Sequence, residues 1–147
     1  MEHEFEFVDR VTSDLSFVAR GPTLEALFAA AAEALLAATL EDPASVAPRV
    51  RREVLLEEPD LELLLLRFLN ELVYLRDAEQ LLLRPRRMRV SVNEVAHLEA
   101  ELVGEEIDIG RHCMDIEVKA ATAHGLRIAR AIAGESAEWE ASVTLDV

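Results

Sequence analysis

Two aspartates near opposite ends of the 147-residue chain, Asp14 and Asp146, have the chemistry of ligands for a hard metal cation. Residues 138–147 alternate in polarity, which places Asp146 on the polar face of a strand, beside Val147. Asp14 has the same polar parity in residues 14–20. If the first and last strands are neighbours, the two carboxylates and the Val147 carboxylate would form an all-oxygen cluster suited to Ca2+. Spacing alone leaves a solvated chain end as the alternative.

A second group of candidate residues lies within 117–126. Lys119 is the only lysine among the fifteen Lys and Arg residues of the chain, and His124 follows it closely. Such a pair could transfer protons near neutral pH, although a structural role for His124 and a chance origin for a lone lysine remain open. No serine or cysteine with a paired base is evident, because Cys113, the single cysteine, only adjoins His112 in sequence.

Composition and charge narrow the classes of ligand. The chain is 51% hydrophobic and 30% charged, as in globular proteins, and its formal net charge is -14. This charge disfavours tight, unaided binding to nucleic acid and favours divalent cations or cationic protein surfaces as ligands. One cysteine excludes an internal disulfide and a multi-thiolate zinc site. No secretory leader or membrane-spanning segment is evident, which predicts a cytoplasmic protein with no membrane partner.

Hydrophobic periodicity predicts two helices and a larger number of strands. The helices are expected from residue 24 to about 39 and over 61–77, with Thr23 and Asp60 as N-caps. The strands are expected at 4–8, 15–20, 50–57, 86–95, 96–103, 117–126 with an extension over 127–133, and 138–147, with a turn near 134–136. The pattern indicates one α+β domain over residues 1–147, a compact sandwich of two long helices packed on a mainly antiparallel or mixed sheet.

Two further polar patterns each have a structural and a functional interpretation. On the second helix, a narrow seam at i, i+3, i+4 and i+7 is either a solvated face or a functional one; it consists of Arg67, Asn70, Glu71 and Tyr74. The stretch 84–89 contains the only basic cluster. Its arginines would either protect an edge strand from aggregation or contact an acidic partner or RNA.

Several segments, taken in chain order, resemble the archease family. Val11-Thr-Ser-Asp14 leading to Gly21 is similar to the family's N-terminal His-Thr-Ala-Asp pattern, and residues 60–75 are similar to its Asn-Glu-bearing helix. The other matches are Gly104, Glu105, Asp108 and His112, then Glu117 to Leu126, and finally Asp146-Val147. The resemblance extends from about residue 5 to the end of the chain.

The resemblance implies a function. Archeases promote guanylylation and multiple turnover of the RtcB-type RNA ligase in tRNA splicing and RNA repair, without sealing RNA themselves. It therefore implies a non-catalytic activator that binds a divalent cation, usually Ca2+. By position, the metal ligands would be Asp14, Asp146 and Val147. Lys119 is similar to the family's functional lysine, and His124 and Glu117 of the same motif are further candidates for ligase activation.

One departure from the family pattern and two alternative functions remain. Val11 stands where the family usually has histidine, and loss of such a neighbour of Asp14 predicts weaker metal binding or another cation. The first alternative is a general chaperone-like modulator of nucleic-acid-processing proteins. The second is a metal-dependent hydrolase that uses Asp14, Asp146 and His124, although no three-ligand zinc pattern is present.

Overall fold

The computed structural model describes residues 4–11, 13–133 and 136–147, and only the main chain at 9–11, 131–133 and 136. Two α-helices, seven strands and a short 3-10 turn make up this part of the chain. In order they are β1 Glu4–Val11, β2 Asp14–Gly21, α1 Leu24–Thr39, η1 Pro43–Ser45, β3 Val50–Glu58, α2 Leu61–Glu79, β4 Leu81–Val92, β5 Ala96–Glu106, β6 Ala120–Ala133 and β7 Ser136–Asp146.

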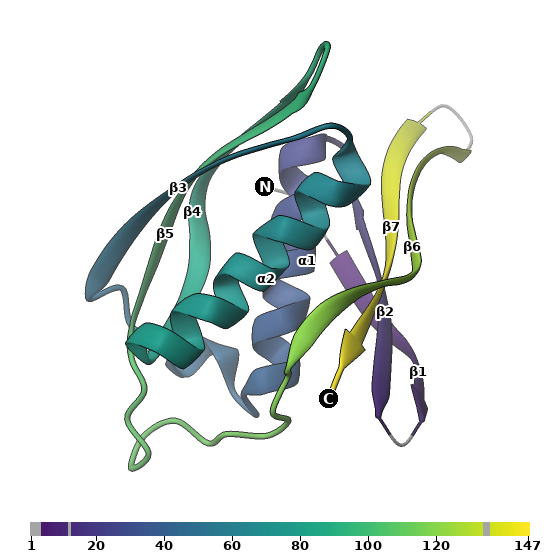
Figure 1. Cartoon of the computed structure of the whole chain (residues 1–147). Coiled ribbons are helices and arrows are strands. Elements are labelled where there is room, and N and C mark those ends of the chain that lie inside the picture. Colours follow the sequence, from purple (N-terminus) through teal and green to yellow (C-terminus); the bar gives the residue numbers. More distant parts are fainter. Residues whose placement is uncertain (1–3, 12, 134–135) are drawn as a thin grey trace.

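The strands form two antiparallel sheets with the helices between them (Figure 1). The larger sheet has the order β1-β2-β7-β6 and the smaller one the order β3-β5-β4. Helix α1 contacts β2 of the first sheet and β4 of the second, while α2 contacts β6, β4 and β3. The predicted fold class, two helices packed on antiparallel sheet, is therefore confirmed, and the strands divide into two sheets rather than forming one.

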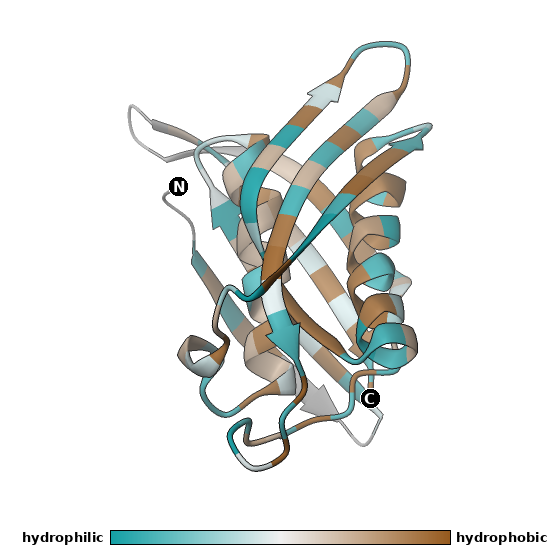
Figure 2. Cartoon of the chain, turned by 90° about the vertical axis from the view of Figure 1, so that its left-hand side faces the viewer, coloured by the Kyte–Doolittle hydropathy of each residue, from teal (hydrophilic) through white to brown (hydrophobic). Residues whose placement is uncertain are grey.

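The core between the sheets follows from the alternation seen in the sequence. Leu15, Phe17 and Ala19 of β2 are buried on the same face as Ala141 and Val143 of β7. Figure 2 shows the same alternation of polar and apolar residues along the strands of the smaller sheet. Where a strand buries alternate residues, as β2 does, its opposite side remains available for polar residues.

Both predicted helix starts are confirmed by their hydrogen bonds. The Thr23 hydroxyl accepts from the Ala26 N–H at 3.1 Å, and the Asp60 carboxylate accepts from the Leu63 N–H at 2.8 Å. Each cap satisfies an N–H that has no partner within the helix. Phe28 of α1 and Phe68 of α2 then pack with ring centroids 6.3 Å apart, fully buried.

The start of β4 differs from the prediction. The strand begins at Leu81 rather than at residue 86, directly after Gln80 ends α2 in a left-handed conformation (φ 58°). Pro85 lies inside the strand, where the register with β5 shifts. Proline is tolerated there because β4 is an edge strand and needs no N–H for a further neighbour. The turn predicted near 134–136 falls partly on Gly134 and Glu135, outside the described residues.

The start of β6 was also predicted wrongly. The strand begins at Ala120 rather than at Glu117, and the residues just before it have no regular secondary structure. Their main chain bonds to the end of α1: the Asp115 N–H donates to Thr39 O at 2.8 Å and the Ile116 N–H to Ala38 O at 3.1 Å. Within 117–119, the Lys119 N–H donates to Asp146 O of β7 and the Val118 carbonyl accepts from Arg76, so these residues approach the sheet without forming its regular ladder.

Candidate metal-binding site

The predicted proximity of the two aspartates is present in the structure. Strands β2 and β7 are antiparallel neighbours, and their register pairs Asp14 directly with Asp146. Residues paired in this way project to the same face with Cβ atoms about 4.5–5.5 Å apart. Both side chains are half-buried on the outer face of the larger sheet. Two carboxylates from opposite ends of the chain therefore share one small region of surface, which we call the aspartate pair.

Main-chain hydrogen bonds fix the segments around the aspartate pair. The Val147 N–H donates to Ser13 O at 2.9 Å, in the turn that precedes Asp14. The Lys119 N–H donates to Asp146 O at 2.8 Å, just before β6 begins. Val147 thus continues past β7 alongside the β1–β2 turn, and its main-chain oxygen is available in the same region. These contacts explain why the two ends stay together: each is hydrogen-bonded to a neighbouring element.

Hydroxyl groups continue the polar face beyond the aspartate pair, a feature the sequence argument did not single out. The Ser16 and Thr144 hydroxyls lie 3.2 Å apart, and the Thr122 hydroxyl donates to Thr144 O at 3.2 Å. Thr144 is buried, with 7% exposure. The polar parity of Ser16 and Thr144 was visible in the sequence, but their pairing required knowledge of which strands are neighbours.

A bulge in β6 covers part of this polar face. Thr122 pairs with Thr144 and Arg127 with Ser142, so residues 123–126 stand opposite a single residue of β7. Gly125 adopts φ 67° there, a conformation that glycine tolerates best. An added Cβ at Gly125 would lie 4.0 Å from the Thr144 hydroxyl, which places the bulge over that residue. His124 is exposed on the bulge.

The structure places the other predicted site residues, Lys119, His124 and Glu117, in different surroundings. Lys119 is exposed and adjoins Ala120, the register partner of Asp146, so its main chain lies beside the pair. Among the described residues, no hydrogen bond or ion pair joins His124 or Glu117 to either aspartate, or Lys119 to His124. The proposed Lys–His proton-transfer pair therefore has no contact in support, and Glu117 lies in a separate groove.

The donor set of the aspartate pair fits a hard cation only with help from other oxygens. Within the described part of the chain, no three His, Cys, Asp or Glu side chains come together in a way that could hold a metal ion. A cation at the pair would need oxygen from Val147 and from water in addition to the two carboxylates. Ca2+ tolerates such mixed, flexible oxygen coordination, whereas Zn2+ prefers nitrogen and sulfur donors. The side chain of Val11, which replaces the family histidine, lies outside the described residues.

A second polar cluster, which we call the Glu105 cluster, consists of Ala47, Arg49, Glu105, Arg111 and His112. The Glu105 carboxylate is 3% exposed and accepts hydrogen bonds from Arg111, from the Ala47 N–H at 2.5 Å and from His112 Nε2 at 3.1 Å. Arg49 Nε lies 3.3 Å from it. The Arg111 hydrogen bond, followed by that from Ala47, lowers the pKa of Glu105 to about 2.

The histidine of this cluster is fixed from both sides of its ring. The Asp108 N–H donates to His112 Nδ1 at 2.9 Å, so Nε2 carries the proton that is donated to Glu105. The residue before Glu105 is glycine, Gly104, and a Cβ added there would lie 1.8 Å from Leu82 O. The matched family residues Gly104, Glu105, Asp108 and His112 therefore anchor the loop that follows β5, and none of them is near the aspartate pair in the sheet register.

Some residues of the remaining polar patterns contact other parts of the protein. The Asn70 side chain of α2 accepts a hydrogen bond from the Ala121 N–H at 2.8 Å and donates one to Ala121 O at 3.0 Å. These bonds satisfy both main-chain groups of Ala121 at the edge of β6. In the basic stretch, Arg84 pairs with Glu33 and Arg86 with Glu101 on edge strand β4. Arg84 and Arg86 are thus engaged within the protein, and both interpretations of the basic cluster stay predictions.

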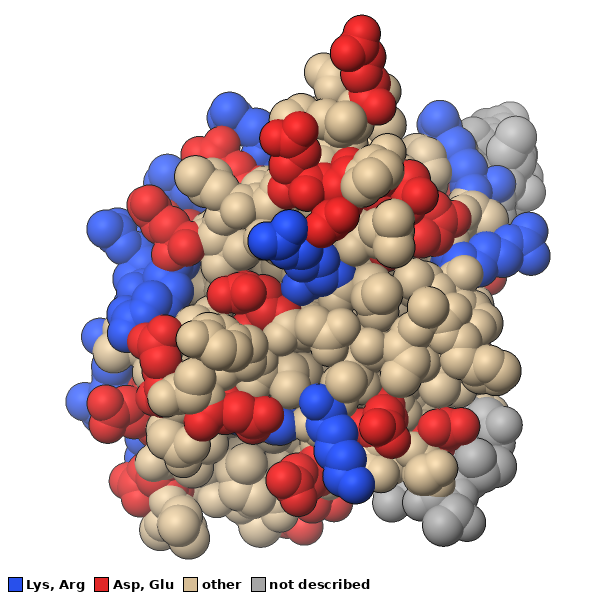
Figure 3. All heavy atoms as spheres, viewed as in Figure 1, with Lys and Arg blue, Asp and Glu red and all other residues tan. Residues whose placement is uncertain are grey.

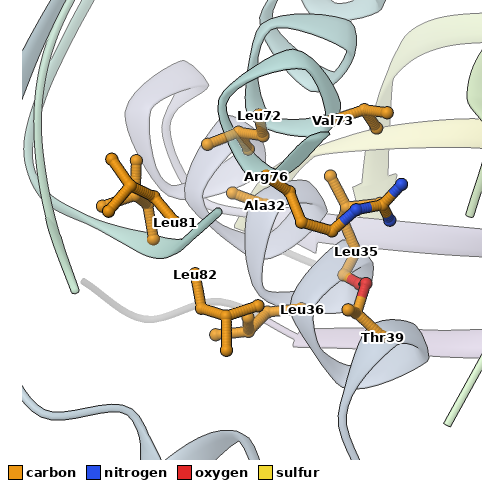
Figure 4. Close-up of a pocket in the computed structure, with 10 residues that line it drawn as sticks. Ala32, Leu35, Leu36, Thr39, Leu72, Val73, Arg76, Leu81 and Leu82 are labelled. Atoms are coloured by element: carbon orange, nitrogen blue, oxygen red, sulfur yellow. The ribbon is translucent and has the colours of Figure 1, made fainter. Parts of the chain in front are cut away.

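The space between the two helices and β4 is too small for a ligand. A space of about 20 Å3 lies between α1, α2 and β4, with the Arg76 guanidinium and the Thr39 hydroxyl at its polar side (Figure 4). It has room for about one water molecule. None of the described helices is long and apolar enough to cross a membrane. Candidate binding features are therefore on the surface.

Comparison with known proteins identifies close relatives along almost the whole chain. Residues 5–147 match the model of the Archease protein family (MTH1598/TM1083). A protein archease of Thermococcus gammatolerans is 42% identical over 118 residues, 80% of this chain and 82% of its own length. One from Methanosarcina barkeri is 32% identical over 147 residues, 98% of this chain and 96% of its own length.

Solved structures share the fold. The solution structure of Methanobacterium thermoautotrophicum protein 1598 matches with a TM-score of 0.79 at 32% identity, covering 97% of this chain and 98% of that one. A crystal structure from Thermotoga maritima, described as an archease and possible chaperone, matches with a TM-score of 0.58 at 16% identity. It covers 95% of this chain and 98% of that one, a likeness of fold alone.

Proposed function

This chain belongs to the archease family, and on that premise we propose that it is a non-catalytic activator of an RtcB-type RNA ligase. It would promote guanylylation and multiple turnover of the ligase in tRNA splicing or RNA repair. We propose that it does so with a divalent cation, Ca2+, bound by Asp14, Asp146 and Val147. The observation that carries the proposal is the direct register pairing of Asp14 with Asp146.

The electrostatics of the surface support a protein partner. On the face seen in Figure 3, acidic side chains lie in several groups interspersed with basic ones, and the formal net charge is -14. A ligase that handles RNA presents a cationic cleft, to which an acidic protein is attracted over long range. The same charge works against tight direct binding of RNA by this chain. We expect encounter with the ligase to be accelerated at low salt.

Each residue of the candidate site has a distinct task in this proposal. Asp14 and Asp146 hold the cation from adjacent strands, and the β2–β7 ladder keeps their separation fixed. When bound, the cation neutralises the two carboxylates and supplies a positive centre for a phosphate group at the ligase. Lys119, held beside Asp146 through its main chain, places an ammonium group at the same end of the sheet. The ammonium group of lysine is a compact point charge, whereas the guanidinium group of arginine is planar and larger, so arginine is not an equivalent substitute.

The proposal is tested by multiple-turnover RNA ligation with the cognate ligase, with and without chelator. We expect wild-type protein to raise the number of ligations per ligase, and Asp14→Asn, Asp146→Asn and Lys119→Arg each to lose this effect. Glu94→Gln, an exposed carboxylate in the β4–β5 turn, is the matched control. Stimulation by both aspartate variants at the wild-type level would refute the proposal.

The same assay separates the alternative functions. A general chaperone-like modulator would stimulate unrelated nucleic-acid-processing enzymes and would be indifferent to chelator. A metal-dependent hydrolase would turn over phosphate esters without any ligase. We expect neither behaviour from the purified chain.

A further inference from the structure

A surface groove of about 260 Å3 lies between the C-terminal end of α2 and the segment that leads to β6. Its lining consists of Arg76, Asp77, Gln80, Ile107, Met114, Asp115, Ile116 and Glu117. Ile107 and Ile116 are half-buried, and Met114 is 42% exposed although it is a large apolar residue. The groove therefore combines an apolar interior with charged residues around it.

Both walls of the groove are held by main-chain hydrogen bonds. The Ile107 N–H donates to Gln80 O at 2.8 Å, which ties one wall to the end of α2. Asp115 and Ile116 donate to the last residues of α1, and Met114 forms an isolated bridge with Leu40. A groove fixed on both sides is preformed, so a ligand that enters it has little loop ordering to oppose its binding.

The charges around the groove are negative in balance. The Arg76 guanidinium donates hydrogen bonds to the Asp77 carboxylate at 2.8 Å and to Val118 O at 2.5 Å. Asp115 and Glu117, in contrast, are exposed. Neither of these two carboxylates has an ion-pair partner among the described residues. The C-terminal end of α2 adds the negative pole of the helix. The groove thus complements a side chain with an apolar stem and a positive end, the combination that arginine and lysine provide.

We propose that this groove binds an arginine or lysine side chain from a loop of the protein partner. The apolar stem would lie on Ile107, Met114 and Ile116, with the cation between Asp115 and Glu117. This inference rests on the proposed function only in naming the ligase as that partner. Lys119, beside Asp146, lies two residues after Glu117, so the groove would hold the partner next to the aspartate pair.

The groove can be tested without the ligase. The probe is the peptide acetyl-Leu-Arg-Leu-amide, compared with its uncharged citrulline analogue, in a methyl NMR titration of the full chain. We expect shifts at Ile107, Met114 and Ile116 with the arginine peptide, and binding about three- to tenfold weaker for the citrulline peptide. The double variant Asp115→Asn/Glu117→Gln should weaken arginine-peptide binding by a similar factor. Equal binding of the two peptides, or no shift at these methyl groups, would overturn the proposal.

A control and a second measurement separate this result from that of the proposed function. Glu53→Gln/Glu99→Gln removes the same charge from the outer face of the smaller sheet and should leave peptide binding unchanged. If its effect equals that of the groove variant, net charge alone explains the binding and the groove proposal is wrong. With the ligase, the groove variant should bind at least about threefold more weakly while its Ca2+ affinity stays unchanged. If the ligase does not bind wild-type protein, the proposed function fails, and the peptide titration still decides the groove.

Discussion

The Glu105 cluster and the aspartate pair are both carboxylate sites, but the burial and the bonding partners of their carboxylates differ. Glu105 is buried and receives hydrogen bonds from Arg111, Ala47 and His112. Asp14 and Asp146 are half-buried and lie opposite each other on the neighbouring strands β2 and β7. Neither has an ion-pair partner among the described residues. The Glu105 carboxylate receives its hydrogen bonds from its own chain, whereas the aspartate pair places two negative charges side by side.

This contrast suggests a test that separates a structural carboxylate from one proposed to bind a ligand. A carboxylate whose hydrogen bonds are all supplied by its own fold stabilises a loop, and its loss should unfold that loop. Two like charges directly opposite each other on a sheet are unfavourable without a counter-charge. A bound cation would supply the missing charge and remove this repulsion. Stability measurements should therefore respond with opposite sign at the two sites.

The largest effect is expected from Gly104→Ala, next to the Glu105 cluster. The new Cβ would lie 1.8 Å from Leu82 O, a main-chain atom that cannot move aside. We expect a loss of more than about 4 kcal/mol in the free energy of unfolding, or failure to fold, measured by chemical denaturation. Gly110→Ala is the control, because its Cβ meets only the Asp108 carboxylate at 3.4 Å. A folded Gly104→Ala protein of wild-type stability would contradict the close approach.

His112→Ala should have the next largest effect. The substitution removes a buried ring that bonds to Glu105 and to the Asp108 N–H, and leaves both groups short of a partner. We expect a loss of about 2–4 kcal/mol in the free energy of unfolding. His97→Ala, on the exposed face of β5, should change it by less than about 0.5 kcal/mol. Similar losses for both histidines would mean that the Glu105 cluster contributes nothing specific.

The pH dependence of stability provides a third test of the Glu105 cluster. Because the pKa of Glu105 falls from 4.5 to about 2 on folding, its stabilisation is complete above about pH 4.5 and disappears as the pH falls towards 2. Between these values, wild-type protein should lose more stability than Glu105→Gln, which has no carboxylate to protonate. Urea midpoints measured from pH 6 to pH 2 check this, and parallel curves for the two proteins would contradict it.

The smallest effect is expected at the aspartate pair, and its sign is opposite. In the presence of chelator, Asp14→Asn removes the repulsion from Asp146 and should raise the free energy of unfolding by roughly 0.2–1 kcal/mol. Glu94→Gln, far from any like-charged register partner, should have no such effect. A clear destabilisation by Asp14→Asn without metal would show that the carboxylate has a structural role like that of Glu105.

Much of the fold could be predicted because local patterns express it. The alternation in residues 138–147 matched the buried face of β7, and Thr23 and Asp60 cap the helices as their side-chain chemistry requires. Residues 117–119 were assigned to a strand incorrectly, because alternation of side chains indicates a strand whether or not the main chain forms a regular ladder. Hydrogen-bond partners distant in sequence leave no local trace.

The candidate site could be predicted only in part for the same reason. Side-chain parity placed Asp14 and Asp146 on polar faces, but periodicity cannot say which strands are neighbours, and β2 and β7 are separated by most of the chain. The structural task of Asn70 was also hidden, because its partner is the main chain of Ala121 on another element. That the aspartate pair binds a cation stays a prediction.

Calorimetric titration with Ca2+ shows whether the aspartate pair is a cation site. We predict that wild-type protein binds one Ca2+ per chain, and that Asp14→Asn and Asp146→Asn each weaken binding at least about tenfold, while Glu94→Gln does not. The stabilising sign expected for Asp14→Asn in chelator should also reverse when Ca2+ is added, since ligand that binds only the folded state stabilises it. Equal Ca2+ affinity of the wild-type protein and both aspartate variants would rule out a cation site at the aspartate pair.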